Sequence, residues 1–337
     1  MIDVRISMSG KLAISVVAVL LVALGAFFLT RPSGAPTVKL PENVSLIVGV
    51  GTHGNVSSET KALMSGVRYY RTDITLGSNQ ISQIMSESQQ SGAQYLGILD
   101  YETLDGIGSR YSWNLSTWNE SVTDALQEYP EISTWELWNE PWVQAFQTGY
   151  MNGSAYNYYQ VIRSAYEIIK AKEPNSTVVC FGGAPIYEPD IFEWYSQVWN
   201  YGAANYCDAI SIHAYVGGAT LLNQSGNAQY WAQGLYAYWN LTHKKIWITE
   251  TGMPAYSYAN PSVYSQQAQN NFLAQDIGFF SSFSYVKRVY WYDLWGLSDG
   301  SLRNDYGLLN LSEPYSGKPK LAWQSFLSIY NSSASAG

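Results

Sequence analysis

The run STWELWNE, residues 133–140, is apolar along most of its length and ends in an asparagine and a glutamate. Such a run is typical of a strand that is covered on both faces, as in a parallel sheet. Seven similar runs start about 35 residues apart, which is the spacing of strand–helix units: SLIVGV (45–50), VRYYRTDI (67–74), AQYLGILDY (93–101), TVVCFGGA (177–184), DAISIHAY (208–215), KIWITETG (245–252) and KRVYWYDL (287–294). Eight such units predict an α/β fold, a single (β/α)8 barrel.

Helix-like stretches lie between these runs, and several of them end at glycine or proline, as helices do. They cover residues 78–92, 116–130, 156–174, 228–245 and 266–283, and a last one at 318–332 is expected to close the outer ring. The 337 residues are 47% hydrophobic, which excludes a disordered chain. Because the composition shows no break, we expect one domain over residues 37–337.

The charge of the chain limits its partners. Charged residues make up only 13%, and 26 acidic against 18 basic residues leave a net charge of −8. Non-specific nucleic-acid binding depends on basic residues that displace counterions from phosphates, so we do not expect it. The 28 tyrosines and 13 tryptophans offer ring faces with one polar handle each, which suits neutral hydroxylated ligands such as sugars. Rings that simply fill the core would give the same composition.

Cysteine and histidine are scarce. Two cysteines and three histidines, without any H-E-x-x-H or C-x-x-C spacing, do not indicate a metal site, and we expect no metal and no cofactor. Cys180 and Cys207 fall in consecutive predicted strands and could pair in an exported protein. Two buried free thiols are the favoured expectation.

The N-terminal region indicates export. Residues 12–29 contain no charge over 18 positions and follow Arg5 and Lys11. This length favours an uncleaved membrane anchor over a signal peptide, with residues 1–36 as cytoplasmic tip, anchor and linker. The basic residues before the segment place the rest of the chain outside the cell. Secretion after cleavage near Ala35 is the alternative.

Glycosylation motifs agree with export. Ten Asn-x-Ser/Thr sequons occur, against roughly three expected by chance, and they predict a glycosylated surface: Asn43, Asn55, Asn114, Asn119, Asn152, Asn175, Asn223, Asn240, Asn310 and Asn331.

In a (β/α)8 barrel the functional side chains lie just beyond the C-terminal ends of the strands. Polar and aromatic residues gather at those positions in this sequence: His53, Arg71, Asp73, Asp100, Tyr101, Asn139, Glu140, His213, Tyr215, Glu250, Trp291, Asp293 and Trp295. The fifth strand offers only Gly182 and Gly183. A ring of such groups at one end of a barrel predicts a binding or catalytic site there.

Two of these residues fit the cleavage of a sugar acetal. That reaction needs a proton for the leaving oxygen and a group that stabilises the anomeric carbon, and paired carboxyl groups supply both. Glu140 and Glu250 end strands that lie across the barrel from one another. A separation of about 5–5.5 Å would favour retention of configuration, and one above about 6.5 Å would favour inversion. We expect Arg71 and Tyr215 to keep Glu250 ionised. Glu136, inside its strand, is expected to be a buried structural acid.

The motifs WELWNEPW (135–142), ITETG (248–252) and ISIHAY (210–215) resemble those of the retaining glycoside hydrolases of clan A, and family 5 and family 39 in particular. The third strand ends in LDYE and lacks the histidine often found there in family 5. The resemblance implies Glu140 as acid/base and Glu250 as nucleophile. It also implies that Asn139 binds the hydroxyl next to the reacting carbon.

The remaining binding residues follow from the same resemblance and from their places at the strand ends. Trp291 is expected to form the floor of the cleaved-bond subsite, and Arg71, His213, Tyr215, His53 and Trp295 are further candidates for substrate contact. The expected substrates are β-linked oligo- or polysaccharides of the β-glucan or β-mannan type. Each candidate also has a structural alternative, as a core residue or a rim ion-pair partner.

Two other functions compete with this one. GVGTHG (49–54), followed by Asp73, matches a dinucleotide-binding fingerprint, but residues 55–60 suggest a turn where that fold needs a helix. A non-catalytic surface protein could bind glycans through its aromatic rim, although it would need neither Glu140 nor Glu250. The sequence does not indicate an oligomeric state.

Overall fold

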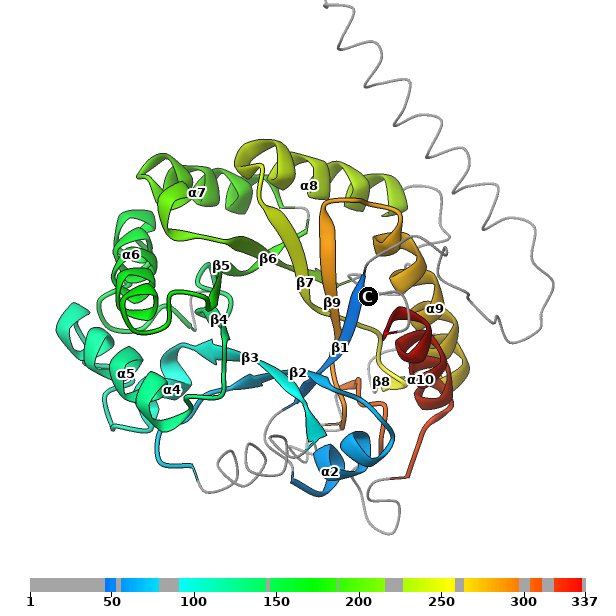
Figure 1. The fold of residues 1–337 in the computed structure, drawn as a ribbon. Coiled ribbons are helices and arrows are strands. Elements are labelled where there is room, and N and C mark those ends of the chain that lie inside the picture. Colours follow the sequence, from blue (N-terminus) through cyan, green and yellow to red (C-terminus); the bar gives the residue numbers. More distant parts are fainter. Residues whose placement is uncertain are drawn as a thin grey trace, which may run out of the picture.

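The computed structural model describes residues 46–52, 56–78, 91–143, 146–186, 188–215, 227–257, 264–296, 304–310 and 318–334. Eight parallel strands close into a barrel in the order β1-β2-β3-β4-β5-β6-β7-β9 (Figure 1). Their bounds are Ile47–Thr52, Tyr69–Asp73, Gln94–Leu99, Thr134–Leu137, Thr177–Pro185, Ala209–Tyr215, Lys245–Gly252 and Val286–Trp291. The predicted (β/α)8 barrel and all eight of its strands are confirmed.

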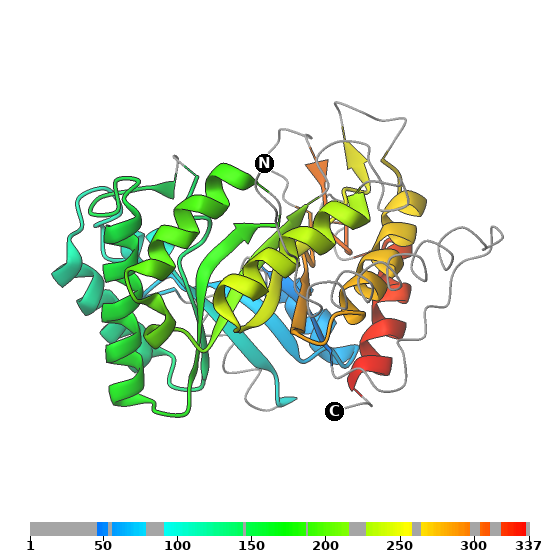
Figure 2. The ribbon, with the colours of Figure 1, turned by 90° about the horizontal axis from the view of Figure 1, so that it is seen from above.

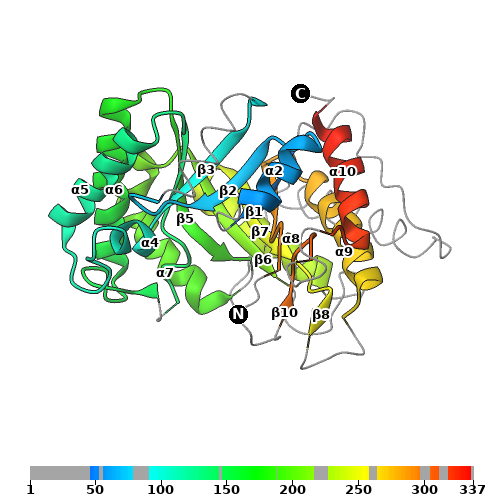
Figure 3. The same cartoon turned by 90° about the horizontal axis from the view of Figure 1, so that it is seen from below.

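Helices surround the strands in Figure 1. They are α2 (Val56–Met64), α4 (Tyr101–Asp105), α5 (Leu115–Glu128), α6 (Ala155–Lys172), α7 (Pro189–Asn200), α8 (Asn227–Thr242), α9 (Gln266–Ser281) and α10 (Leu321–Ala334), with a short 3-10 helix η2 (Ala203–Tyr206). In Figures 2 and 3, α5 and α6 lie on the opposite side of the strands from α9 and α10. A two-stranded antiparallel sheet, β8 (Tyr256–Ser257) with β10 (Asn304–Asp305), lies outside the barrel.

The N-terminal predictions are only partly addressed by the structure. Residues 12–29, the expected anchor, lie outside the described residues, and so does most of the predicted helix 78–92. No helix within the described ranges is long and apolar enough to cross a membrane. The boundary between residues 1–36 and 37–337 stays a prediction.

Two apolar cores follow from the alternation of side chains along the strands. The larger one lies between the strands and the helices and contains Val48, Val50, Val289 and Trp291. The smaller one fills the barrel interior with Leu96, Val179, Ala209, Trp247 and Tyr290. Each strand therefore presents apolar groups on both faces, which is why the sequence shows continuous apolar runs.

Gly49, the first glycine of GVGTHG, makes room for a side chain of this interior. A Cβ on Gly49 would lie 2.6 Å from the Tyr290 ring and 2.8 Å from the Tyr69 carbonyl oxygen. The closed barrel excludes the dinucleotide-binding alternative, which needs an open sheet. The expectation of a turn at residues 55–60 is wrong, because α2 begins at Val56.

The expectation of two free thiols is also wrong. Cys180 on β5 and Cys207 form a disulfide, with Cα atoms 5.7 Å apart. The cause is local: Gly202, at φ 110°, turns the chain after α7, and η2 returns it to the start of β6. There the Val178 amide donates to the Asp208 carboxylate, at 2.8 Å, which holds the returning chain beside β5.

Candidate active site

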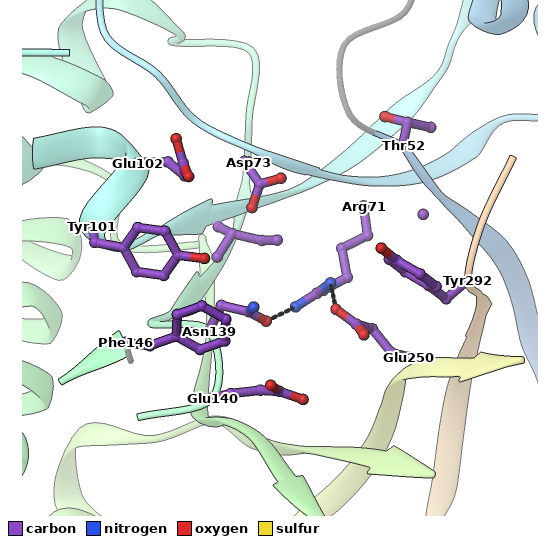
Figure 4. A pocket seen from close by; sticks show the side chains of 12 residues that line it. Thr52, Arg71, Asp73, Tyr101, Glu102, Asn139, Glu140, Phe146, Glu250 and Tyr292 are labelled. Carbon is purple, nitrogen blue, oxygen red and sulfur yellow. Dashed lines mark hydrogen bonds and ion pairs between the residues drawn. The ribbon is translucent and has the colours of Figure 1, made fainter. Parts of the chain in front are cut away.

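A pocket of about 290 Å³ opens at the C-terminal ends of the barrel strands (Figure 4). Its lining contains four carboxyl groups, one guanidinium group and three aromatic rings: Gly51, Thr52, Arg71, Asp73, Ile98, Tyr101, Glu102, Asn139, Glu140, Phe146, Glu250 and Tyr292. The predicted pair of glutamates, Glu140 and Glu250, therefore meets in one cavity.

A β-bulge aims Glu250 into the pocket. Ile212 on β6 pairs with Ile248, and His213 pairs with Glu250, so Thr249 is an extra residue on β7. Thr249 Oγ1 donates to Glu136 Oε1, at 2.9 Å, inside the barrel. Because the bulge breaks the alternation of β7, Glu250 also faces the interior.

Glu250 is almost enclosed by donors. Arg71 Nη1 donates to its Oε1, and the Tyr215 hydroxyl donates to its Oε2, both at 2.6 Å. Burial by itself raises the pKa of this carboxyl, but the attraction of His213 and Arg71 and the hydrogen bond from Tyr215 outweigh burial. The pKa of Glu250 is thus lowered from its ordinary value of 4.5. The carboxylate form, which a nucleophile requires, is the stable one.

Arg71 organises the site from β2. Its Nε donates to Glu136 Oε2 at 2.6 Å, and its Nη2 donates to Asn139 Oδ1 at 2.9 Å. The side chain is only 4% exposed. Burial by itself would lower the pKa of Arg71, but the negative charges of Glu136 and Glu250 outweigh burial and raise it. The guanidinium therefore stays charged. The planar guanidinium of Arg71 thus links the C-terminal ends of β4 and β7, which carry Glu140 and Glu250.

Two left-handed residues turn the chain after β4. Trp138 has φ 74° and Glu140 has φ 45°, and the Glu140 amide donates to the Gly182 carbonyl oxygen at 2.6 Å. A Cβ on Gly182 would lie 2.6 Å from the Trp138 carbonyl oxygen. The glycine of β5 therefore permits the turn that brings Asn139 and Glu140 into the pocket. Such strained conformations are common at functional sites.

His213 on β6 joins the two glutamates. Its Nδ1 lies 2.9 Å from Glu140 Oε1 and 3.6 Å from Glu250 Oε2. Its Nε2 lies 3.4 Å from Arg71 Nη2, which can only donate, so we assign the ring proton to Nδ1, facing Glu140. The ring is accommodated by Gly183, where a Cβ would lie 2.2 Å from His213 Nε2.

A family model described as "Glycosyl hydrolase catalytic core" matches residues 102–313, which is more than half of the chain. The chain belongs to this glycosyl hydrolase family. No curated protein sequence matches the chain.

Solved structures share the fold of this glycosyl hydrolase at low identity. A family 39 glycoside hydrolase from the gut symbiont Bacteroides cellulosilyticus WH2 has a TM-score of 0.63 and 19% identity, covering 86% of this chain and 64% of that one. A β-glucuronidase from Ruminococcus gnavus, in complex with D-glucuronic acid, has a TM-score of 0.59, 13% identity and coverages of 85% and 49%. A β-galacturonidase from Eisenbergiella tayi has a TM-score of 0.58 and 15% identity, covering 85% of this chain and 51% of that one.

The glycosyl hydrolase chain spans between about half and two thirds of the length of these structures. At such identities the likeness concerns the fold alone. The resemblance of the strand-end motifs to clan A agrees with the family match.

Four of the further predicted site residues lie around the glutamates. Arg71, Asn139, His213 and Tyr215 join the network around the glutamates. His53 lies outside the described residues.

Trp291 and Trp295 are not part of the pocket lining. Trp291 has no exposed surface and packs against Phe272 of α9, so it cannot form a subsite floor. The next residue, Tyr292, lines the pocket instead. The reason is the alternation of β9, in which Tyr290 faces the interior and Trp291 faces the helices. Trp295 is half-buried and packs against the larger core.

Several lining residues were not singled out for binding from the sequence. Tyr101 and Phe146 stack with ring centroids 5.1 Å apart and form an aromatic wall of the pocket. Phe146 lies well beyond the end of β4, in the segment that leads to α6, so a rule that considers only residues just past the strand ends could not find it. Glu136, expected to be a structural acid, is fully buried against Arg71, as predicted.

Among the described residues, Glu140, His213 and Glu250 could also hold a metal ion, because one ligand atom from each lies within 4.8 Å of the others. The Arg71 guanidinium, 2.6 Å from Glu250, would repel a cation at that point. The donor set therefore fits proton transfer better than metal binding.

Proposed function

We propose that this chain is a retaining β-glycoside hydrolase that cleaves β-linked oligo- or polysaccharides of the β-glucan or β-mannan type. The observation that carries the proposal is the approach of Glu140 to Glu250, with carboxylate oxygens within 4.8 Å of one another. One oxygen of each carboxyl group enters this limit, and so close an approach favours the roughly 5–5.5 Å separation of retaining enzymes over the wider gap that holds a water in inverting ones.

In the first step Glu140, protonated, donates its proton to the glycosidic oxygen while Glu250 attacks the anomeric carbon. The bond to the leaving sugar breaks, and a covalent glycosyl-enzyme forms on Glu250. Arg71 and Tyr215 hold the attacking carboxylate in place through two hydrogen bonds of 2.6 Å. Asn139, which is fixed by Arg71, is in position to bind the sugar hydroxyl next to the reacting carbon.

In the second step Glu140, now a carboxylate, takes a proton from water, which attacks the anomeric carbon from the opposite face. The sugar is released with its original configuration, and both glutamates return to their starting states. His213 supports both steps, because its Nδ1 proton can stabilise the carboxylate that Glu140 becomes. The reaction balances without any cofactor.

The substrate assignment rests on the pocket walls. The rings of Phe146 and Tyr292 line the pocket and suit the apolar face of a sugar, whereas both faces of Tyr101 are covered, by Phe146 and Arg110. We further propose that the enzyme acts outside the cell, is held at the membrane by residues 12–29 and carries glycans on its sequons. Release by cleavage near Ala35 is the alternative.

Glutamine substitutions test the catalytic roles. We expect E140Q and E250Q each to lower turnover of an aryl β-glycoside by roughly 1,000-fold or more while substrate still binds. E167Q, on the exposed face of α6, is the matched control and should keep wild-type turnover. Unchanged turnover in E250Q or E140Q would overturn the assignment, and a pure glycan-binding protein would show binding without turnover in the wild type.

Product stereochemistry tests the mechanism independently. By NMR, a β-glycoside should first release the β anomer. With azide, E250A should form an α-glycosyl azide by a single displacement, whereas E140A should form a β-glycosyl azide from the glycosyl-enzyme. An α anomer released first by the wild type would contradict retention.

A further inference from the structure

Two acids that the proposed mechanism does not use line the pocket. Asp73 lies two residues after Arg71 on β2, so both side chains leave the same face of the strand. Glu102 lies in the first turn of α4, directly after β3. Figure 4 shows Asp73 and Glu102 on the far side of the pocket from Glu140. We name Asp73 and Glu102 the acidic wall.

Positive charge is scarce around this wall. Among the described lining residues Arg71 is the only cation, and it is already bound to Glu136 and Glu250 at 2.6 Å each. It donates to Asn139 as well, which leaves little of its fork for a ligand.

Arg110, a described cation that contacts Glu102, is divided between several partners. Arg110 lies 3.6 Å from Glu102 and 3.4 Å from Asp105, and its guanidinium stacks 4.5 Å above the Tyr101 ring. Outside the described residues, the segments between positions 53 and 317 contain only two residues that could carry positive charge, His53 and Arg303.

The acidic wall affects the pKa of Asp100, a buried acid beside it. Asp100 caps α4 through the Glu102 amide, which donates to its Oδ1 at 2.7 Å, and it has no exposed surface. Burial raises the pKa of Asp100 well above its ordinary range, and the charge of Asp73 raises it further. An anion in the pocket would likewise be repelled by Asp73 and Glu102, which line it.

We infer that the sugar bound beside Glu250 is uncharged, and that the acidic wall excludes uronates and other anionic sugars. This inference rests on the proposed function, since it concerns the glycone of the same reaction. Carboxylates accept hydrogen bonds from sugar hydroxyls without an electrostatic penalty. A unit negative charge about 5 Å from one of them, at an effective dielectric constant of about 20, changes an equilibrium by roughly 100-fold. The inference separates this chain from the uronidases that share its fold.

Matched substrate pairs test the inference. Aryl β-glucoside and β-glucuronide differ mainly in one ionised carboxylate, as do aryl β-galactoside and β-galacturonide. We expect wild-type kcat/KM to favour the neutral member of whichever pair is cleaved by at least roughly 100-fold. Equal or faster cleavage of the uronide would overturn the inference.

Variants locate the cause. D73N and E102Q should each shift the ratio of uronide to neutral kcat/KM towards the uronide by roughly 10-fold. D105N removes a carboxylate from the same helix, exposed and outside the lining, and should leave the ratio unchanged. Should D73N not fold, the half-buried Glu102 provides the second test. A ratio unmoved in both wall variants would overturn the inference.

Binding separates this inference from the proposed function. The E250Q variant can be titrated calorimetrically with methyl β-glucoside and methyl β-glucuronide. If no glycoside is cleaved by the wild type but the neutral ligand binds at least roughly 100-fold more tightly, the hydrolase proposal fails and the acidic wall stands. If neutral glycosides are cleaved but the uronide binds as tightly, the acidic wall fails and the hydrolase proposal stands.

Discussion

Replacing Arg71 by methionine keeps an unbranched apolar stem and removes the guanidinium charge that helps to hold Glu250 ionised. With charge centres about 4 Å apart and an effective dielectric constant of about 20, the attraction is about 4 kcal/mol. At 1.36 kcal/mol per pKa unit this corresponds to about 3 units, and measured shifts beside arginine are about 1–3 units. We therefore expect R71M to raise the pKa of Glu250 by about 1–3 units.

The direction of the pH dependence follows from that shift. The folded pKa of Glu250 lies below its unfolded value, so the ionised carboxylate stabilises the wild type above about pH 4.5. That contribution is lost as the pH falls through the folded pKa. In R71M the acid limb of kcat/KM should move to higher pH by the same 1–3 units. Because Glu136 and Glu250 then stay buried without the guanidinium that they share, unfolding should also become easier by about 3–5 kcal/mol.

Two measurements test this: the pH profile of kcat/KM, which reports the free enzyme, and urea unfolding at several pH values. R71K keeps the charge but cannot reach three acceptors at once, so its acid limb should move less than that of R71M. R163M, which breaks the exposed pair with Glu167, should change neither readout. An R71M profile with the wild-type acid limb would refute the electrostatic role given to Arg71.

Two further predictions concern the strand that carries no catalytic group. G183A places a Cβ against the His213 ring at a φ of 78°, so unfolding should become easier by about 3 kcal/mol and kcat should fall. G108A, at φ 70° with open space around it, is the control, and an equal loss in both variants would contradict the argument. The double variant C180S/C207S opens a cross-link of 27 residues and should lose about 3 kcal/mol in urea unfolding. A wild type whose unfolding is insensitive to reductant would speak against a stabilising disulfide.

The barrel could be predicted from the sequence because its strands are buried on both faces. Val48, Val50 and Gly49 show the pattern: the valines pack towards the helices and the glycine makes room for Tyr290 inside. Such strands appear as uninterrupted apolar runs, and their regular spacing gives the topology. The two glutamates of the pocket could be placed for the same reason, since each lies at or near the C-terminal end of one of these runs.

Because both faces of each strand are buried, the sequence does not indicate which residues of a strand face the pocket. At the end of β9, Tyr290, Trp291 and the following Tyr292 are all aromatic, so no polar–apolar alternation separates the interior face from the helix face. Only the packing of Tyr290 with the interior core and of Trp291 with Phe272 resolves the register. The cysteine pair was mistaken because its geometry depends on the turn at Gly202, which sequence spacing does not describe.

The position of Glu250 shows how far strand alternation alone can be followed. Trp247 packs in the barrel interior and Thr249 binds Glu136 there, so strict alternation would turn Glu250 outward towards the helices. The extra residue in β7 reverses this outcome and pairs Glu250 with His213. Alternation alone would therefore have turned Glu250 away from the barrel mouth. It faces the mouth only because the bulge at Thr249 shifts the alternation by one residue. The nucleophilic role proposed for Glu250 therefore depends on that bulge as well as on its carboxylate.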